Sequence, residues 1–327
     1  MDSLSAYYID VLILLDSTLR LATPLILAAL AGMFGERAGV VDIGLEGKML
    51  GAAFAAAAAA AVTGSAWMGL LTGILSSMAL ALLHGWVSIH QRGNQIVSGT
   101  AINIAVAGLA PTLANHWFRL NGQTPLLGQD ARFQPIIWPG AEALANVPAI
   151  GPLYAEVISG HNIITYLAIL LVPVSAWVLY RTRFGLRLRA AGENPEAVDT
   201  AGINVYAIRY QAMLINGFLC GMAGTVLSTA LGSAFVRDMS AGKGFLALAA
   251  MIFGKWKPVP TLIACLLFGF VDALQGRLQG VAMPIIGEIP FQFTIMLPYV
   301  FTVIILAGFV GRIDAPKASG VPYVKGG

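Results

Sequence analysis

The chain has 327 residues, of which 57% are hydrophobic and 11% are charged, and its formal net charge is +3. An average soluble domain has about 25% charged residues, or roughly 82 in a chain of this length, whereas this chain has 19 basic and 16 acidic residues. So few charges cannot cover a water-facing surface, and the mean hydropathy of +0.78 agrees that most of the chain faces lipid. The composition therefore excludes a soluble enzyme or a DNA-binding module, and the dispersed basic residues exclude a nucleic-acid partner.

Long apolar stretches predict transmembrane helices, because a helix that crosses a bilayer needs about 20 mainly apolar residues. We therefore expect an all-α polytopic membrane protein, a bundle of about nine transmembrane helices that forms a single domain over residues 1–327. The segment before these helices, residues 1–17, is expected to be a short amphipathic lead-in. The predicted spans are Leu19–Phe34, Lys48–Val62, Trp67–Ile89, Gln95–Trp117, Ile163–Tyr180, Ile208–Leu231, Gly242–Gly254, Thr261–Leu274 and Phe291–Gly311.

The segment Gly242–Gly254 is short for a crossing, so it is either one of nine spans or a re-entrant, broken helix. Charge distinguishes the two, since Lys and Arg concentrate in cytoplasmic loops. The stretch RTRFGLRLR has four arginines within residues 181–189, which makes the loop 181–207 cytoplasmic. Nine spans then place 13 basic residues inside and 6 outside. We expect nine spans, with the N-terminus outside and the C-terminus in the cytoplasm.

Two segments outside the predicted spans are long enough to have a role of their own. The loop 118–162 falls on the external side, where it is either a tether between helices or a docking surface for an external partner. Residues 312–327 form a cytoplasmic tail, which we expect to be disordered, as exposed termini usually are.

No motif for chemistry on covalent bonds occurs in the sequence. It contains no nucleotide-binding loop, no HExxH and no GxSxG, and its two cysteines lie in apolar stretches that favour neither a disulfide nor a metal site. We expect no catalytic residue, metal or cofactor. If ATP drives the protein, another chain must bind it.

Residues 193–202 predict a short helix with defined ends. Asn194 is a favourable N-cap and Pro195 suits the first helical position, while Gly202 suits the C-terminal end. We expect a two-turn helix over Pro195–Ala201 between two membrane spans. It is either a connector or a helix that sits in a groove of a cytoplasmic protein, and its defined ends, followed at once by a new span, favour the second.

Four stretches have a distinctive sequence: GERAGVVDIGLEGKML (35–50), NQIVSGTAIN (94–103), AAGENPEAVDTAGI (190–203) and GKGFLALAAMIFGKWKP (242–258). They resemble the permease subunits of bacterial ABC importers of the nucleoside and simple-sugar type, which are related to the ribose and branched-chain amino-acid permeases. The resemblance implies a bacterial cytoplasmic membrane protein that pairs with a second, non-identical permease and with a cytoplasmic ABC ATPase. An external binding lipoprotein or periplasmic protein would deliver the substrate.

The resemblance also implies which residues pass the motion of the ATPase to the membrane helices. By position, six residues match the coupling helix of the family, which docks on the ATPase. They are Glu193, Asn194, Pro195, Glu196, Ala197 and Gly202.

Polar side chains within the spans are the candidates for lining a translocation path, because they are costly in lipid and usually face the bundle interior. Asp272 would either pair across the bundle or line the path, and an interhelical hydrogen bond explains Gln95, Asn103 and Asn216 equally well. The candidates are Glu46, Gln95, Asn103, Asn216, Asp272 and Gln275.

The charged stretch 36–48 has two interpretations. Its charges either neutralise one another in a cytoplasmic loop, or belong to a broken segment close to the path, as the resemblance suggests. Gly242–Gly254 occupies a comparable place in the second half of the chain, and such paired, glycine-interrupted segments are a known indicator of a transport site.

These features together predict a gated path for nucleosides, driven by a separate ATPase. A simple sugar is the second candidate for the cargo, and a branched-chain amino acid is the third. An ion-coupled secondary transporter usually needs intramembrane carboxylates or histidines, for which Asp272 is a thin basis. A membrane scaffold would leave the glycine-interrupted segments unexplained.

Overall fold

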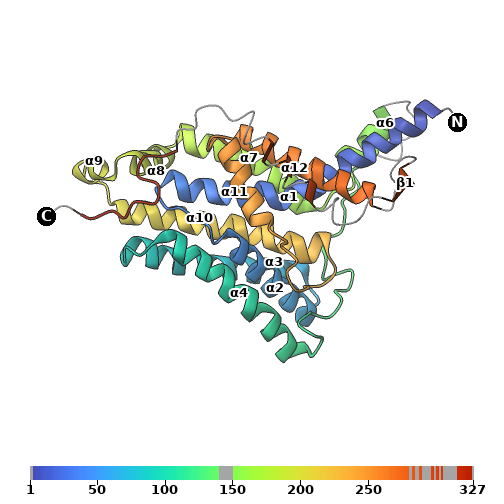
Figure 1. Ribbon diagram of the computed structural model, residues 1–327, viewed down its shortest axis with the longest axis horizontal. Helices are drawn as coiled ribbons and strands as arrows, with labels where there is room; N and C mark the ends of the chain where they lie inside the picture. Colours follow the sequence, from blue (N-terminus) through green and yellow to red (C-terminus); the bar gives the residue numbers. More distant parts are fainter. Residues whose placement is uncertain are drawn as a thin grey trace.

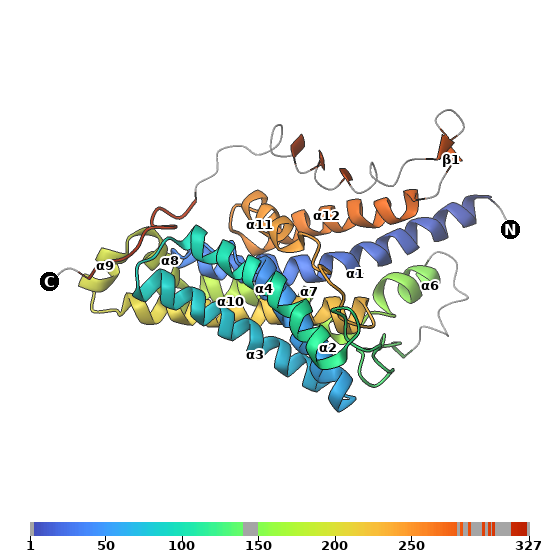
Figure 2. The ribbon, with the colours of Figure 1, turned by 60° about the horizontal axis from the view of Figure 1, so that its bottom comes forward.

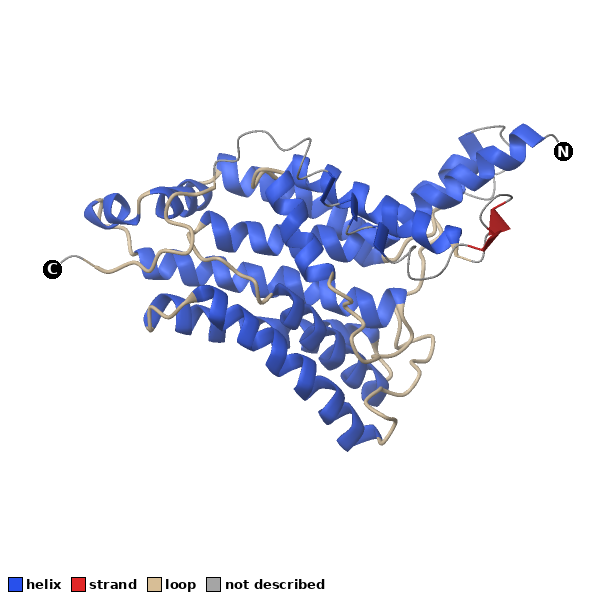
Figure 3. Cartoon of the chain, viewed as in Figure 1, coloured by secondary structure: helices blue, strands red, loops and turns tan. Residues whose placement is uncertain are grey.

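The computed structural model describes residues 3–139, 150–279, 282–283, 287–288, 296–297, 300–301, 303–304 and 315–325. Within these ranges the chain is almost wholly helical (Figure 3), apart from one pair of two-residue strands, β1 (Ala282–Met283) and β2 (Gly287–Glu288). Seven helical stretches are long and apolar enough to cross a membrane. The predicted last span, 291–311, lies mostly outside the described residues.

The long helices agree with seven of the predicted spans. They are α1 (Ser3–Arg37), α2 (Leu45–Thr63), α3 (Ala66–Gly85), α4 (Gln95–Phe118), α7 (Ile163–Arg181), α10 (Val205–Val226) and α12 (Pro258–Leu278). Three π-helical turns each continue a preceding α-helix. These are η1 (Trp86–His90) after α3, η2 (Tyr154–Ile158) after α6 (Ile150–Leu153), and η3 (Leu227–Leu231) after α10.

The first helix is longer than the sequence indicates. Helix α1 begins at Ser3, so residues 3–17 are its first part and do not form a separate lead-in. Asp16 accepts a hydrogen bond from Arg20 Nε at 3.0 Å. An ion pair between residues four positions apart stabilises a continuous helix.

Helices α1 and α10 form the centre of the bundle. Helix α1 lies against α10, α12 and α11 (Lys243–Phe253), while α10 also lies against α2 and α3 (Figures 1 and 2). Glycines allow the close approach of α10 and α3: a Cβ atom at Gly217 or Gly221 would lie 2.6 Å from the Cα atom of Met78 or Ile74. Bundle packing in lipid depends on such small residues.

Two short helices, α8 (Arg183–Glu193) and α9 (Pro195–Thr200), lie at one end of the bundle (Figure 1), which we call the α9 end. The sequence predicted the second: Asn194 Oδ1 accepts a hydrogen bond from Ala197 N at 3.1 Å, and Gly202 follows with φ +78°. Helix α8 was not predicted. Thr182 caps it by accepting a hydrogen bond from Gly185 N at 3.1 Å.

The expectation of a disordered tail is wrong for residues 315–325. This segment folds back onto the α9 end beside α8 and α9 (Figure 2). The Ala318 N–H donates to the Gly192 carbonyl at 2.8 Å, and the rings of Tyr323 and Tyr206 lie 5.5 Å apart. Backbone hydrogen bonds and ring packing therefore order a segment whose composition indicates none.

Replacing Gly221 by valine should separate α10 from α3, because the new side chain would overlap the Ile74 backbone. We expect a loss of stability of about 1–3 kcal/mol, seen as a lower melting temperature of the purified protein in detergent. Gly276→Val is the matched control, since no atom lies within 4 Å of a Cβ atom at Gly276. Equal melting temperatures for the two variants would contradict the close approach.

Candidate functional site

Two non-helical segments enter the bundle, and each leads into a helix. Residues 38–44 precede α2, and residues 232–242 precede α11. The N-termini of these two helices lie side by side, since a Cβ atom at Gly244 would lie 2.6 Å from the Cα atom of Glu46. We call residues 38–48 and 242–244 the broken-helix centre.

Glu46 joins the two halves of this centre. It lies in the first turn of α2, and its two carboxylate oxygens accept hydrogen bonds from the N-terminus of α11: Oε1 from Gly242 N at 2.8 Å and Oε2 from Gly244 N at 2.6 Å. The first amides of a helix have no partner within the helix and carry its partial positive charge. A carboxylate at this position satisfies the amides and stabilises α11 against α2.

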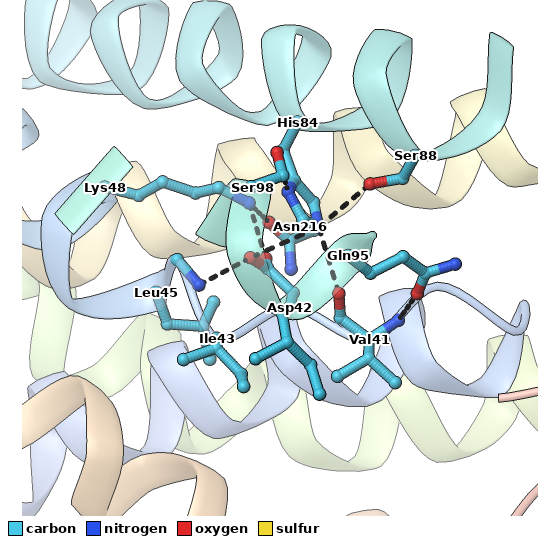
Figure 4. Close-up of polar contacts among 12 residues, drawn as sticks. Val41, Asp42, Ile43, Leu45, Lys48, His84, Ser88, Gln95, Ser98 and Asn216 are labelled. Atoms are coloured by element: carbon cyan, nitrogen blue, oxygen red, sulfur yellow. Dashed lines mark hydrogen bonds and ion pairs between the residues drawn. The ribbon is translucent and has the colours of Figure 1, made fainter. Parts of the chain in front are cut away.

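A buried ion pair holds the turn that leads into α2 (Figure 4). Lys48 Nζ donates to Asp42 Oδ2 and, at 3.0 Å, to Asn216 Oδ1 of α10. The side chains of Lys48 and Asp42 are both fully buried. Asp42 Oδ1 also accepts from Gly44 N at 3.1 Å, so the pair fixes the backbone just before α2.

Side chains of α3 and α4 hold the backbone of Val41, which the break leaves without helical partners. His84 Nε2 lies 2.9 Å from the Val41 carbonyl, and Gln95 Oε1 accepts from Val41 N at 2.6 Å. The other ring nitrogen of His84 lies 3.0 Å from Ser98 Oγ. With Nε2 donating to the carbonyl and Nδ1 accepting from Ser98, a neutral imidazole satisfies both contacts.

Two asparagines also form hydrogen bonds with backbone groups. Asn103 of α4 accepts from Gly47 N at 2.7 Å and donates to the Ile43 carbonyl at 2.9 Å. Asn216 donates to the Ala31 carbonyl of α1 at 2.9 Å while it accepts from Lys48. Four of the predicted path residues therefore meet at the broken-helix centre. They are Glu46, Gln95, Asn103 and Asn216.

The other two predicted path residues lie on α12. Asp272 accepts a hydrogen bond from Lys243 Nζ at 2.7 Å, so it pairs with the first residue of α11. Asp272 thus forms an ion pair across the bundle, which is one of its two predicted roles. Gln275 lies almost one turn further along α12 and has no hydrogen bond to the broken-helix centre among the described residues.

Neither Lys48 nor Asp42 was among the site residues predicted from the sequence. Both lie in the stretch 35–50, whose charges were predicted to form either a neutralised loop or a broken segment, and the structure contains elements of both. Lys48 and Asp42 neutralise each other inside the bundle, whereas Glu36 accepts from Trp256 Nε1 at 2.6 Å. Arg37 donates to the Trp256 carbonyl, at 2.9 Å from Nη2.

The residues predicted to contact an ATPase lie at the α9 end, on exposed surface. Glu193, Asn194, Glu196, Ala197 and Gly202 are all exposed, and Pro195 is half-buried. A groove of about 540 Å³ separates α8 from α9. Its lining is Arg183, Leu186, Arg187, Ala190, Glu193, Asn194, Ala197, Val198, Ala201 and Ile203.

Comparison with known proteins places these features in a family. Residues 14–312 match the family described as the permease component of branched-chain amino acid transport systems. The chain belongs to this family of transport permeases. The resemblance predicted from the four stretches is confirmed, and this family member is a multi-pass membrane protein with seven helices of membrane-crossing length among its described residues.

Three relatives match nearly the whole permease. The guanosine ABC transporter permease protein NupQ of Bacillus subtilis is 38% identical over 96% of this chain and 97% of its own. The nucleoside ABC transporter permease protein NupC of Lactococcus lactis is 40% identical over the same shares. TsgC13 of Haloferax volcanii, whose name assigns it provisionally to glucose transport, is 35% identical over 93% of each chain.

Replacing Lys48 by methionine should destabilise this permease strongly, because it leaves the Asp42 carboxylate buried without its cation. Loss of one partner of a buried ion pair costs about 3–5 kcal/mol. The double variant Lys48→Met/Asp42→Asn removes both charges and should recover most of the loss. Melting temperatures in detergent measure the cycle, and additive effects of the two single substitutions would contradict a direct pair.

Proposed function

We propose that this chain is the transmembrane permease subunit of an ATP-binding cassette importer and forms the translocation path for nucleosides. The observation that carries the cargo assignment is the identity of 38% and 40%, over nearly the full chain, to permeases named for guanosine and for nucleosides. The relative named for glucose, at 35% identity, supports a simple sugar as the alternative.

In this proposal the energy comes from a separate ATPase through α9. The exposed residues Glu193, Glu196 and Ala197 lie at the end of the bundle, on the surface that a cytoplasmic protein would reach first. Because the exposed helix has capped ends, it can act as a rigid lever on α8 and α10. Docking and movement of the ATPase would then rock the membrane helices between outward-open and inward-open states.

The proposed orientation puts the α9 end in the cytoplasm and the N-terminus outside. The four arginines of residues 181–189 support it, since basic residues concentrate on the cytoplasmic side. Helix α11 has 11 residues, or about 16 Å of helix, roughly half of the hydrocarbon core. It would therefore cross only together with the non-helical segment 232–242, which keeps the count at nine crossings.

We place the translocation path beside the broken-helix centre. Two broken helices whose N-termini meet are the arrangement that many transporters use for substrate sites. The polar groups there are side-chain amides, a carboxylate bound by backbone N–H groups and the ion pair of Lys48 with Asp42, which leave no unpaired charge and suit an uncharged cargo. A second, non-identical permease and an external binding protein, both implied by the family, would complete the importer.

The carboxylates inside the bundle argue against ion coupling. Asp42 pairs with Lys48, Asp272 pairs with Lys243, and Glu46 accepts from two backbone amides. A carrier that couples to protons or sodium needs an intramembrane acid whose charge can change or bind an ion. Among the described residues of the centre, each acid is already neutralised or bound.

Uptake of radiolabelled nucleosides tests the proposal directly. The host should lack its own nucleoside transporters and express this chain with its neighbouring ATPase, permease and binding-protein genes. We expect guanosine uptake that disappears when the ATPase is inactivated. Uptake of ribose alone would change the cargo, and uptake that survives inactivation of the ATPase would overturn the importer.

Two substitutions in α9 should stop transport without preventing membrane insertion. Glu196→Lys reverses an exposed charge on the proposed docking surface, and Ala197→Pro removes the N–H that donates to Asn194. Nucleoside uptake and membrane levels measured in the same cells check this expectation. Asp10→Lys, an exposed charge reversal near the start of α1 and far from the α9 end, is the control. Normal uptake by both α9 variants would refute the coupling role.

A graded series at Glu46 tests the path. Alanine leaves Gly242 N and Gly244 N without acceptors, while glutamine retains one oxygen that can accept. Because charge-assisted hydrogen bonds are worth about 1.5–3 kcal/mol, we expect uptake to fall in the order wild type, Glu46→Gln, Glu46→Ala, by about tenfold or more at the end. Equal uptake by all three, at equal membrane levels, would remove Glu46 from the mechanism.

A further inference from the structure

Residues 315–325 lie across the α9 end and touch two parts of the chain that are far apart in sequence. Ala318 N donates to the Gly192 carbonyl at the end of α8, at 2.8 Å. Two residues later, Gly320 N donates to the Gly39 carbonyl at 3.3 Å, in the segment that leads to Asp42 and α2. The segment is thus bonded both to α8, which precedes the proposed lever α9, and to the broken-helix centre.

Arg209 of α10 ties these two contacts together. Its exposed fraction is 1%, yet it has no ion pair with any described carboxylate. Its guanidinium donates instead to main-chain carbonyls, from Nε to Ala38 at 3.1 Å and from Nη1 to Val321 at 3.3 Å. A buried guanidinium is costly without acceptors, so Arg209 depends on the segment 38–44 and on residues 315–325 at once.

Helix α8 and residues 37–39 also touch directly, backbone to backbone. A Cβ atom at Gly192 would overlap the Arg37 carbonyl oxygen, and one at Gly39 would lie 3.0 Å from the Ala318 carbonyl oxygen. Neither glycine has a side chain that could absorb a shift. In close-packed protein a displacement of α8 is therefore transmitted to residues 37–39.

An aromatic contact anchors the far end of the segment. Tyr323 is 5% exposed and its ring lies 5.5 Å from that of Tyr206, at the start of α10. Lys325 then lines a cavity of about 230 Å³ together with Asp199 of α9 and Asn204. The segment consequently spans the distance from α8, past the broken segment, to the edge of α9.

We propose that residues 315–325 are a clamp that makes α8, α9 and the segment 38–44 move as one unit. Movement of α9 would then reach Glu46 and the N-terminus of α11 through Gly192, Gly39 and Arg209. This inference rests on the proposed function, since it assigns the clamp to the coupling of ATP hydrolysis to transport. It adds a coupling element that lies outside α9.

Ala318→Pro tests the clamp, because proline removes the N–H that donates to Gly192. The complete complex, with its ATPase, second permease and binding protein, is reconstituted in liposomes. We expect the ATPase to co-purify and to hydrolyse ATP at a rate within about twofold of wild type, while guanosine transported per ATP falls about tenfold. The ratio matters because a general loss of stability would lower both rates together.

Lys317→Pro is the matched control. Ser319 N donates to the Pro316 carbonyl, so residue 317 occupies the second position of a turn, where proline is favourable. This variant should keep the wild-type ratio of transport to hydrolysis.

Deletion of residues 315–327 gives a second test that does not depend on how one substitution folds. A wild-type ratio in Ala318→Pro or in the deletion would overturn the clamp and leave the importer intact. Loss of the ATPase from both purified complexes would assign the segment to assembly and also overturn the clamp. Absence of ATP-driven uptake in the wild-type complex would instead overturn the proposed function itself.

Discussion

A helix that breaks inside a membrane leaves peptide groups without partners, and lipid offers none. Residues 38–44 and 232–242 are non-helical segments within the bundle, and side chains of other helices bind their backbone groups. Gln95, Asn103 and His84 bind the backbone of the first break, and Glu46 binds the amides that follow the second. Polar side chains, which are costly in a membrane helix, therefore stabilise these non-helical segments.

The buried charges also stabilise the first non-helical segment. Lys48 and Asp42 have no exposed surface, and each would be destabilising alone. As a pair that also binds Asn216 and Gly44, they hold α1, α2 and α10 in one register. A uniformly apolar bundle would be simpler to stabilise, but it would present no polar surface to a hydrophilic cargo. In the proposed function, the two non-helical segments and their partners would provide that surface without an unpaired charge.

Backbone contacts join the α9 end to the broken-helix centre. Gly192 and Gly39 have no side chains, so α8 lies directly on the turn that starts the first break. Arg209, buried without a carboxylate partner among the described residues, binds carbonyls on both sides of that junction. The α9 end and the broken-helix centre are thus linked by short contacts, along which the proposed clamp would pass a movement.

Features that depend on neighbouring residues could be predicted from the sequence. Apolar length identified seven helices of membrane-crossing length, and Asn194, Pro195 and Gly202 located α9 to within one residue, because caps act over three or four positions. The partners of the polar residues could not be predicted, because they come together only in the packed bundle. Glu46 and Gly242 are 196 positions apart, and the segment 315–325 is ordered by α8 and α10 and not by its own composition. Such contacts arise when helices pack, so no local pattern encodes them.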